Sequence, residues 1–143
     1  MLVKQISVFL ENKSGHLAEA TKTLGDNKID IRALYIAETT EYGILRMIVD
    51  KPDEAQAALS ENGFTVSETD VIAIAVPDRP GTLDEALEIL SANAISIEYL
   101  YAYVGRSSTD AIVVIRVERP QQALEKFEQS GIRVLSAKEV YGN

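Results

Sequence analysis

The stretch "NKSGHL" at residues 12–17 returns as "DRPGTL" at residues 78–83, and this repetition decides the predicted fold. Each copy follows a run rich in β-branched residues, which is typical of a strand. Each copy also precedes apolar residues at helical spacing. We name the two copies the first elbow and the second elbow. A strand, a glycine-containing elbow and a helix are therefore predicted twice.

The repeat extends well beyond the elbows. Identical residues lie 66 positions apart in the first part of each half: Gly15 and Gly81, Leu17 and Leu83, Asn27 and Asn93, Ile29 and Ile95, Ile31 and Ile97, Leu34 and Leu100, Tyr35 and Tyr101. The spacing then becomes 68: Pro52 and Pro120, Ala55 and Ala123, Gly63 and Gly131, Val66 and Val134. The change indicates a two-residue insertion in a surface turn between "TTEYG" and "VGRSSTDA". We predict one duplicated module, over residues 1–69 and 70–143.

Both halves present the same order of elements. The predicted strands are "VKQISVFL", "IDIRALYIAE", "GILRMIVD" and "FTVSET" in the first half, and "VIAIAVP", "ISIEYLYAYV", "DAIVVIRVE" and "IRVLSAKEV" in the second. A helix follows each elbow, and a second helix begins at Pro52 or Pro120 and ends before Gly63 or Gly131. The order βαββαβ predicts an α+β fold of two tandem ferredoxin-like domains, with both helices on one face of an antiparallel sheet.

Several finer features are also predicted. Thr82 and Glu85 have the spacing of a capping box at the start of the helix after the second elbow. The buried stripes of the two elbow helices are predicted at Leu17, Thr21 and Leu24, and at Leu83, Ala86, Leu87 and Leu90. The strands "VIAIAV" and "AIVVIRV" are apolar on both sides. We therefore expect the second sheet face to be covered by the other half of the chain or by another copy.

The composition excludes several kinds of protein. The 143 residues carry a net charge of −8 and no cysteine, which disfavours nucleic-acid binding, an anionic membrane surface, disulfides and thiolate sites. The single histidine, His16, has no partner that would complete a metal site or a Ser–His–acid triad. We see no phosphate loop, no signal peptide and no apolar run of about 20 residues that could span a membrane. We expect a cytoplasmic protein that is not an enzyme and needs no cofactor or metal.

The elbow itself has the chemistry of a small-anion site. A helix N-terminus carries unpaired N–H groups and a partial positive charge, and a preceding glycine allows close approach of a carboxylate. Asn12 and Asp78, just upstream, could accept an ammonium group. The elbow could thus hold both ends of an amino acid. The alternative is that glycine and the capping residue serve the turn geometry alone.

These residues resemble the ACT domain over the whole chain, as two tandem copies. The family's usual elbow has Asn or Asp, two residues, Gly, one residue and Leu, often with Pro before the Gly. "DRPGTL" matches fully, and "ENKSGHL" has Ser14 in place of Pro, similar to acetolactate synthase small subunits. Leu10 stands where serine-binding members such as phosphoglycerate dehydrogenase have His, which argues against a serine site of that kind.

The resemblance implies a non-catalytic sensor or regulatory subunit that binds an amino acid at domain interfaces. The implied ligand-binding residues are Asn12, Lys13, Ser14, Gly15, His16 and Leu17, and Asp78, Arg79, Pro80, Gly81, Thr82 and Leu83. The facing side would come from Leu34, Tyr35, Tyr99, Leu100 and Tyr101. The implied partners are a small molecule, another copy of the chain in a homodimer or larger assembly, and a metabolic enzyme.

Two other functions stay open for this sequence, and a third is disfavoured. The chain could be a protein–protein scaffold subunit without a ligand site, or a small enzyme with its site between subunits. An RNA-binding role is disfavoured, because the third strands lack the aromatic residues that stack bases.

The second strands carry a group of tyrosines: Tyr35, Tyr99, Tyr101 and Tyr103. These side chains could pack within the sheet or line a site for an apolar side chain.

Overall fold

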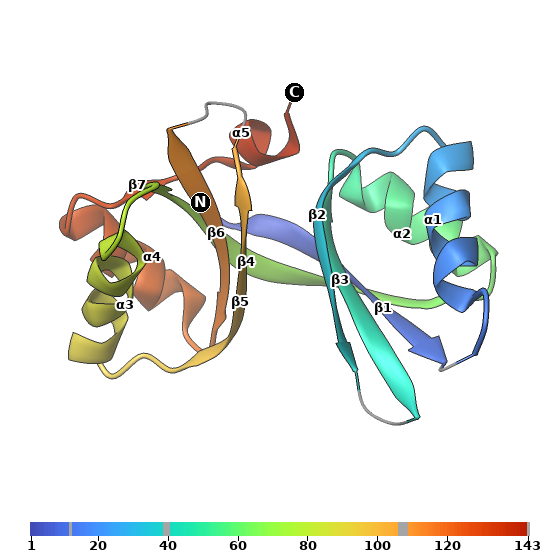
Figure 1. The fold of residues 1–143 in the computed structure, drawn as a ribbon, viewed down its shortest axis with the longest axis horizontal. Coiled ribbons are helices and arrows are strands. Elements are labelled where there is room, and N and C mark those ends of the chain that lie inside the picture. The colour runs from blue at the N-terminus through green and yellow to red at the C-terminus, as the bar shows by residue number, and fades with distance from the viewer. Residues whose placement is uncertain (12, 39–40, 106–108, 143) are drawn as a thin grey trace. The chain divides into compact units, whose positions relative to one another are not determined.

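The computed structural model describes residues 1–11, 13–38, 41–105 and 109–142, which form two compact units (Figure 1). The first unit comprises Lys4–Thr69 and the residues from Val140 on, and the second comprises Met1–Val3 and Asp70–Glu139. Each unit therefore takes a few terminal residues from the other half of the repeat. Tyr141, for example, accepts a hydrogen bond at its hydroxyl from the backbone N–H of Lys4, over 2.8 Å, within the first unit.

The first unit has the predicted βαββαβ order. Its elements are β1 (Val3–Glu11), α1 (His16–Asp26), β2 (Ile31–Glu38), β3 (Tyr42–Val49), α2 (Pro52–Glu61) and the first part of β4 (Thr65–Pro77). The strands lie in the order β2-β3-β1-β4, and β3 pairs antiparallel with both β1 and β2. The two helices cover one face of this sheet (Figure 1). The ferredoxin-like prediction is confirmed.

The second unit repeats this arrangement. It contains the rest of β4, α3 (Thr82–Ala92), β5 (Ile97–Val104), β6 (Asp110–Val117), α4 (Pro120–Gln129) and β7 (Arg133–Val134), and α5 (Ala137–Tyr141) follows. The strands lie in the order β7-β4-β6-β5, with α3 and α4 on one face (Figure 1). The predicted prolines Pro52 and Pro120 do begin α2 and α4.

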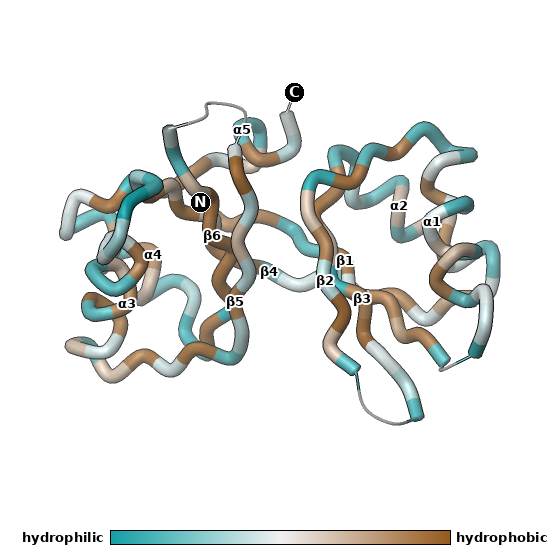
Figure 2. The backbone as a smooth tube through the Cα atoms, in the orientation of Figure 1, coloured by the Kyte–Doolittle hydropathy of each residue, from teal (hydrophilic) through white to brown (hydrophobic). Residues whose placement is uncertain are grey.

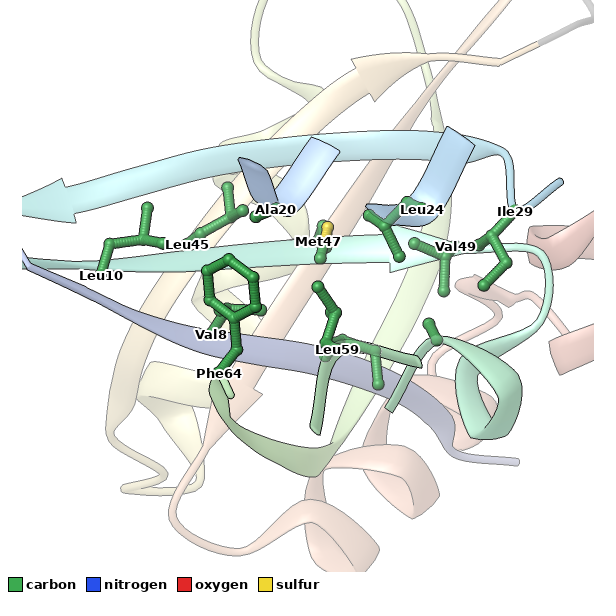
Figure 3. Close-up of a cluster of buried hydrophobic side chains, with 12 residues drawn as sticks. Val8, Leu10, Ala20, Leu24, Ile29, Leu45, Met47, Val49, Leu59 and Phe64 are labelled. Atoms are coloured by element: carbon green, nitrogen blue, oxygen red, sulfur yellow. The ribbon is translucent and has the colours of Figure 1, made fainter. Parts of the chain in front are cut away.

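The hydrophobic core is repeated residue by residue. Every buried residue of the first core except Phe64 has a buried counterpart in the second core at the spacing of 66 or 68 residues (Figure 3). Leu24 corresponds to Leu90 and Met47 corresponds to Ile115, for example. Hydrophobic residues gather in the strands, whereas the helices carry both kinds of residue (Figure 2). The spacing seen in the sequence thus gives true structural equivalence.

Two details of the predicted strands were wrong. "FTVSET" and "VIAIAVP" form one continuous strand, β4, because no glycine or proline interrupts residues 65–76. "IRVLSAKEV" forms a strand of only two residues and then turns into α5. Ser136 and Glu139 explain the turn, because the Ser136 hydroxyl accepts the Glu139 N–H and the Glu139 carboxylate accepts the Ser136 N–H, each over 3.1 Å. That exchange is a capping box.

The predicted starts and faces of the elbow helices also need correction. Thr82 and Glu85 form no capping box, because the Glu85 N–H binds the Gly81 carbonyl oxygen and the Thr82 hydroxyl binds the Pro77 carbonyl oxygen. The buried residues are Ala20, Thr23 and Leu24 in α1, and Thr82, Ala86 and Leu90 in α3. Leu17 and Leu83 are instead 38% and 37% exposed. These side chains belong to the elbow surface.

The structure does not test the predicted two-residue insertion. Part of the predicted insertion falls on residues 39–40 and 106–108, which lie outside the described residues. In the strand pairing, Tyr99 lies opposite Arg116, Tyr101 opposite Val114 and Tyr103 opposite Ile112. Tyr35 lies opposite Arg46.

In the part of the chain that the structure describes, no helix is long and apolar enough to cross a membrane.

Candidate functional site

The two elbows have the same backbone conformation. Gly15 and Gly81 are the N-cap residues of α1 and α3, with φ of 85° and 91°, in the left-handed region that favours glycine. Among the described residues, no atom other than those of the glycine and its two chain neighbours lies within 4 Å of the position where a Cβ would be built on either glycine. Glycine is therefore required here by the backbone conformation, and not by crowding.

The backbone hydrogen bonds of the elbows correspond as well. The N–H of Lys13 binds the carbonyl oxygen of Glu11 over 2.8 Å, and the N–H of Arg79 binds that of Pro77 over 2.9 Å. One turn later, the N–H of Glu19 binds the Gly15 carbonyl oxygen over 2.9 Å, as Glu85 binds Gly81 over 3.0 Å. The same local fold thus presents two helix N-termini to the surface.

The predicted ligand-binding residues are mostly exposed in this turn. Asn12 lies outside the described residues, so its predicted role has no structural counterpart here. Seven residues of the two elbows are exposed: Lys13, Ser14, Leu17, Asp78, Arg79, Pro80 and Leu83. Asp78 uses its backbone N–H, which donates to the Thr109 carbonyl oxygen over 3.1 Å, to tie the second elbow to the β5–β6 connection.

The residues His16 and Thr82, at equivalent places, are turned toward the protein. The Nδ1 atom of His16 accepts a hydrogen bond from the Glu11 N–H over 2.9 Å, and its ring stacks on Phe64 with centroids 5.0 Å apart. Thr82 is 5% exposed and its hydroxyl donates to Pro77 over 2.6 Å. Proline has no N–H, so the second elbow could not form the bond that His16 makes. The single histidine is thereby a packing residue of its loop.

A pocket borders each elbow. The first pocket, of about 140 Å³, lies between the first elbow and the β2–β3 end of the first sheet. Its lining includes Lys13 and Leu17 of the elbow, with Glu11, Ile36, Glu38 and Tyr42. Of the predicted residues it therefore brings together Lys13 and Leu17, whereas Leu34 and Tyr35 are not part of its wall.

The second pocket, of about 250 Å³, lies on a different side of its elbow. Its wall contains Thr82 and Glu85 of α3, Asp110 at the start of β6, and Ile132 and Arg133 at β7. Of the predicted elbow residues only Thr82 takes part. Sequence reasoning missed Asp110 and Arg133, because they lie far from the elbow in the chain and only the strand pairing brings them there.

The charges of the second pocket are linked. Arg133 Nη1 lies 3.8 Å from Asp110 Oδ2, and Arg133 Nη2 lies 2.7 Å from Glu139 Oε2. The backbone N–H of Ser136, which donates to Glu139, holds the pKa of that carboxyl below its usual value. Among the described residues there is no group of three or more acidic or histidine side chains that could hold a metal ion.

Known structures share this arrangement. Protein BT0572 from Bacteroides thetaiotaomicron is 42% identical with a TM-score of 0.94, over 100% of this chain and 98% of that one. The ligand-free regulatory subunit of aspartate kinase from Thermus thermophilus is 18% identical with a TM-score of 0.62, over 90% of this chain and 93% of that one. The corresponding subunit from Thermus flavus is 16% identical with a TM-score of 0.59, over 90% and 92%. The likeness to the two kinase subunits is one of fold.

The family assignment follows from a comparison with family profiles. No curated protein matches the chain. The profile of the ACT domain pair matches residues 1–141. It covers nearly all of the sequence and agrees with the two equivalent units and the two equivalent elbows. The prediction made from the elbow motifs is confirmed, and the chain belongs to the ACT domain pair family.

Proposed function

We propose that this protein is a non-catalytic regulatory module that binds an amino acid at its elbows. The observation that carries the proposal is the exact duplication of the elbow backbone, with a left-handed glycine at each helix start and a pocket beside each turn. A helix N-terminus attracts a carboxylate through its free N–H groups and its dipole. Acidic side chains border both pockets and could hold an ammonium group.

The elements of the proposed site follow the repeat. Residues 1–69 and 70–143 are the two proposed ACT modules. The proposed ligand-binding residues are those of the elbows: Asn12, Lys13, Ser14, Gly15, His16 and Leu17, and Asp78, Arg79, Pro80, Gly81, Thr82 and Leu83. The aspartate kinase subunits of similar fold are named regulatory, which supports a regulatory role at the level of fold. We place the protein in the cytoplasm, without a cofactor.

Association is part of the proposal. β2 and β5 lie at the two ends of the path of paired strands β2-β3-β1-β4-β6-β5. Leu34 and Ile36 of β2 are 47% and 39% exposed, although both are apolar. An exposed apolar edge strand is prone to pair with another chain. We therefore expect a homodimer or larger assembly, and a metabolic enzyme as the regulated partner.

A thermal-shift screen of the purified protein against the twenty amino acids at millimolar concentration tests the proposal. A ligand that binds the native state raises the midpoint by an amount that grows as RT ln(1 + [L]/Kd). We expect a rise with one amino acid or one chemical group of them, reduced by Lys13→Ala or Arg79→Ala. Lys138→Ala, which removes an exposed cation of α5, is the matched control. A flat screen across all twenty would sink the proposal.

The exposed edge also favours a second candidate function, a scaffold subunit without a ligand site. Under this alternative the apolar residues of β2 bind a partner enzyme directly. Co-purification with an enzyme that Leu34→Asp abolishes, together with no response to any amino acid, would support the scaffold over the sensor. A response to an amino acid would decide for the sensor.

A further inference from the structure

The wall of the second pocket differs in side chains from the equivalent place in the first unit. The spacings of 66 and 68 residues, which the two cores obey, identify its equivalent positions. The strand register agrees at this end of both sheets, since Pro77 pairs with Asp110 as Glu11 pairs with Tyr42. A residue-by-residue comparison of the two places is therefore justified.

Aromatic side chains occupy the equivalent place in the first unit. Ala75, Asp110, Thr82 and Ile132 line the second pocket, and their counterparts are Phe9, Tyr42, His16 and Phe64. These four residues form two stacks. Phe9 lies on Tyr42 with ring centroids 5.0 Å apart, and His16 lies on Phe64 at the same separation. Small or polar residues therefore line the pocket in the second unit, whereas stacked rings stand at the equivalent positions of the first unit, with Phe9 and Tyr42 themselves 42% and 39% exposed.

Two of the three charged side chains that line the second pocket are also absent at the equivalent places of the first unit, whereas Glu85 corresponds to another glutamate, Glu19. Arg133 corresponds to Thr65, and Asp110 corresponds to Tyr42. In the second pocket Arg133 offers a guanidinium with five N–H donors, of which Asp110 and Glu139 engage only part. Asp110 and Glu85 offer carboxylates in the same wall. A cation and two anions around one cavity match the two ends of a zwitterion.

We propose that the second pocket is the amino-acid site of this protein, that the ligand's carboxylate binds Arg133 and its ammonium group binds Asp110 and Glu85, and that the first unit has no such site. This inference rests on the proposed function and adds to it the unit, the residues and the stoichiometry. Arginine suits the role because its planar fork binds a carboxylate through two parallel hydrogen bonds. One ligand binds per chain.

Calorimetric titration of the full chain with each of the twenty amino acids tests this site. We expect one molecule bound per chain. Arg133→Gln should weaken the affinity about 10- to 100-fold, because it removes a charge-assisted pair. Ile132→Phe, which installs the residue of the first unit, should abolish binding by filling the cavity. Arg133 is 61% exposed at its side chain, so its replacement leaves the fold intact.

Matched controls separate this inference from the proposed function. Arg119→Gln makes the same replacement in the same unit, but Arg119 precedes α4, whereas the pocket borders the residues after α4. Lys22→Gln removes an exposed cation of α1 in the first unit, outside both elbows. Both variants should bind like the original protein. The deaminated acid and the decarboxylated amine of the ligand found should each bind more than 10-fold more weakly, because each lacks one charged end.

The outcomes are distinct. An amino acid that binds Arg133→Gln and Ile132→Phe as tightly as the original protein overturns the inference and leaves the proposed function standing. Two molecules bound per chain also overturn the inference. Binding of no amino acid overturns both proposals together. Binding of one molecule, weakened by both second-pocket variants and by neither control, supports the site.

Discussion

The first and second units share a core but differ beside their elbows. Their buried residues correspond in the helices and strands alike, from Leu24 and Leu90 to Met47 and Ile115. Their elbows share a left-handed glycine and the same backbone bonds. Yet the first unit carries stacked rings at the positions where the second unit has the pocket of Asp110 and Arg133. Packing constrains the core of both units in the same way, whereas the surface beside the helix start can diverge toward a separate task.

The largest expected effect concerns the equivalence of the two cores. Leu24→Ala and Leu90→Ala each delete a buried side chain at corresponding sites, where Leu24 is 1% and Leu90 is 0% exposed. We expect each to lower the free energy of unfolding by about 3 kcal/mol. Urea denaturation measures both. Leu17→Ala and Leu83→Ala, at exposed positions, should cost less than about 1 kcal/mol. A small loss at only one of the buried sites would show that the cores are not equivalent.

The elbow glycines provide the next effect. Gly15→Ala and Gly81→Ala should each cost about 1–2 kcal/mol, because alanine is strained at φ of 85° and 91°. Gly25→Ala is the matched control inside α1, where no atom crowds the new Cβ. It should instead stabilise the protein by about 0.5–1 kcal/mol. Equal costs at the two elbows would support their equivalence, and a neutral Gly15→Ala would contradict the strained backbone in the first.

A smaller effect on stability is expected where residues other than glycine adopt the left-handed backbone conformation. Lys28 and Ala94 follow α1 and α3 with φ of 59° and 54°. Their carbonyl oxygens are held by Lys51, over 3.0 Å, and by Arg119. Lys28→Gly and Ala94→Gly should each stabilise the protein by about 0.5 kcal/mol, since relief of strain slightly exceeds the greater freedom of the unfolded chain. Thermal unfolding measures the change, and destabilisation by both variants would refute this explanation.

The sequence predicted the fold well because its signals are local or periodic. The glycines of the elbows, the prolines of α2 and α4 and the internal spacing determine the element order. The end of the repeat was harder, because the Ser136–Glu139 capping box turned a predicted strand into α5. The pocket could not be predicted from the elbow alone. Asp110 and Arg133 approach Thr82 only through strand pairing, and no spacing rule joins residues that far apart.

The smallest expected effect is the pH dependence that the Glu139 cap gives to the second unit. Glu139 caps α5, and the hydrogen bond from the Ser136 backbone holds its pKa below the usual 4.5. A lowered pKa in the folded state means that the carboxylate stabilises the protein above pH 4.5. This contribution is lost as the pH falls through the lowered pKa. Glu68, the counterpart of Ser136, lies within continuous β4, so the first unit has no such cap.

Glu139→Gln should therefore destabilise the protein at pH 7 and less so in acid. Urea denaturation between pH 3 and pH 7 measures this, with Glu128→Gln on α4 as control, and an equal loss at every pH would contradict the cap.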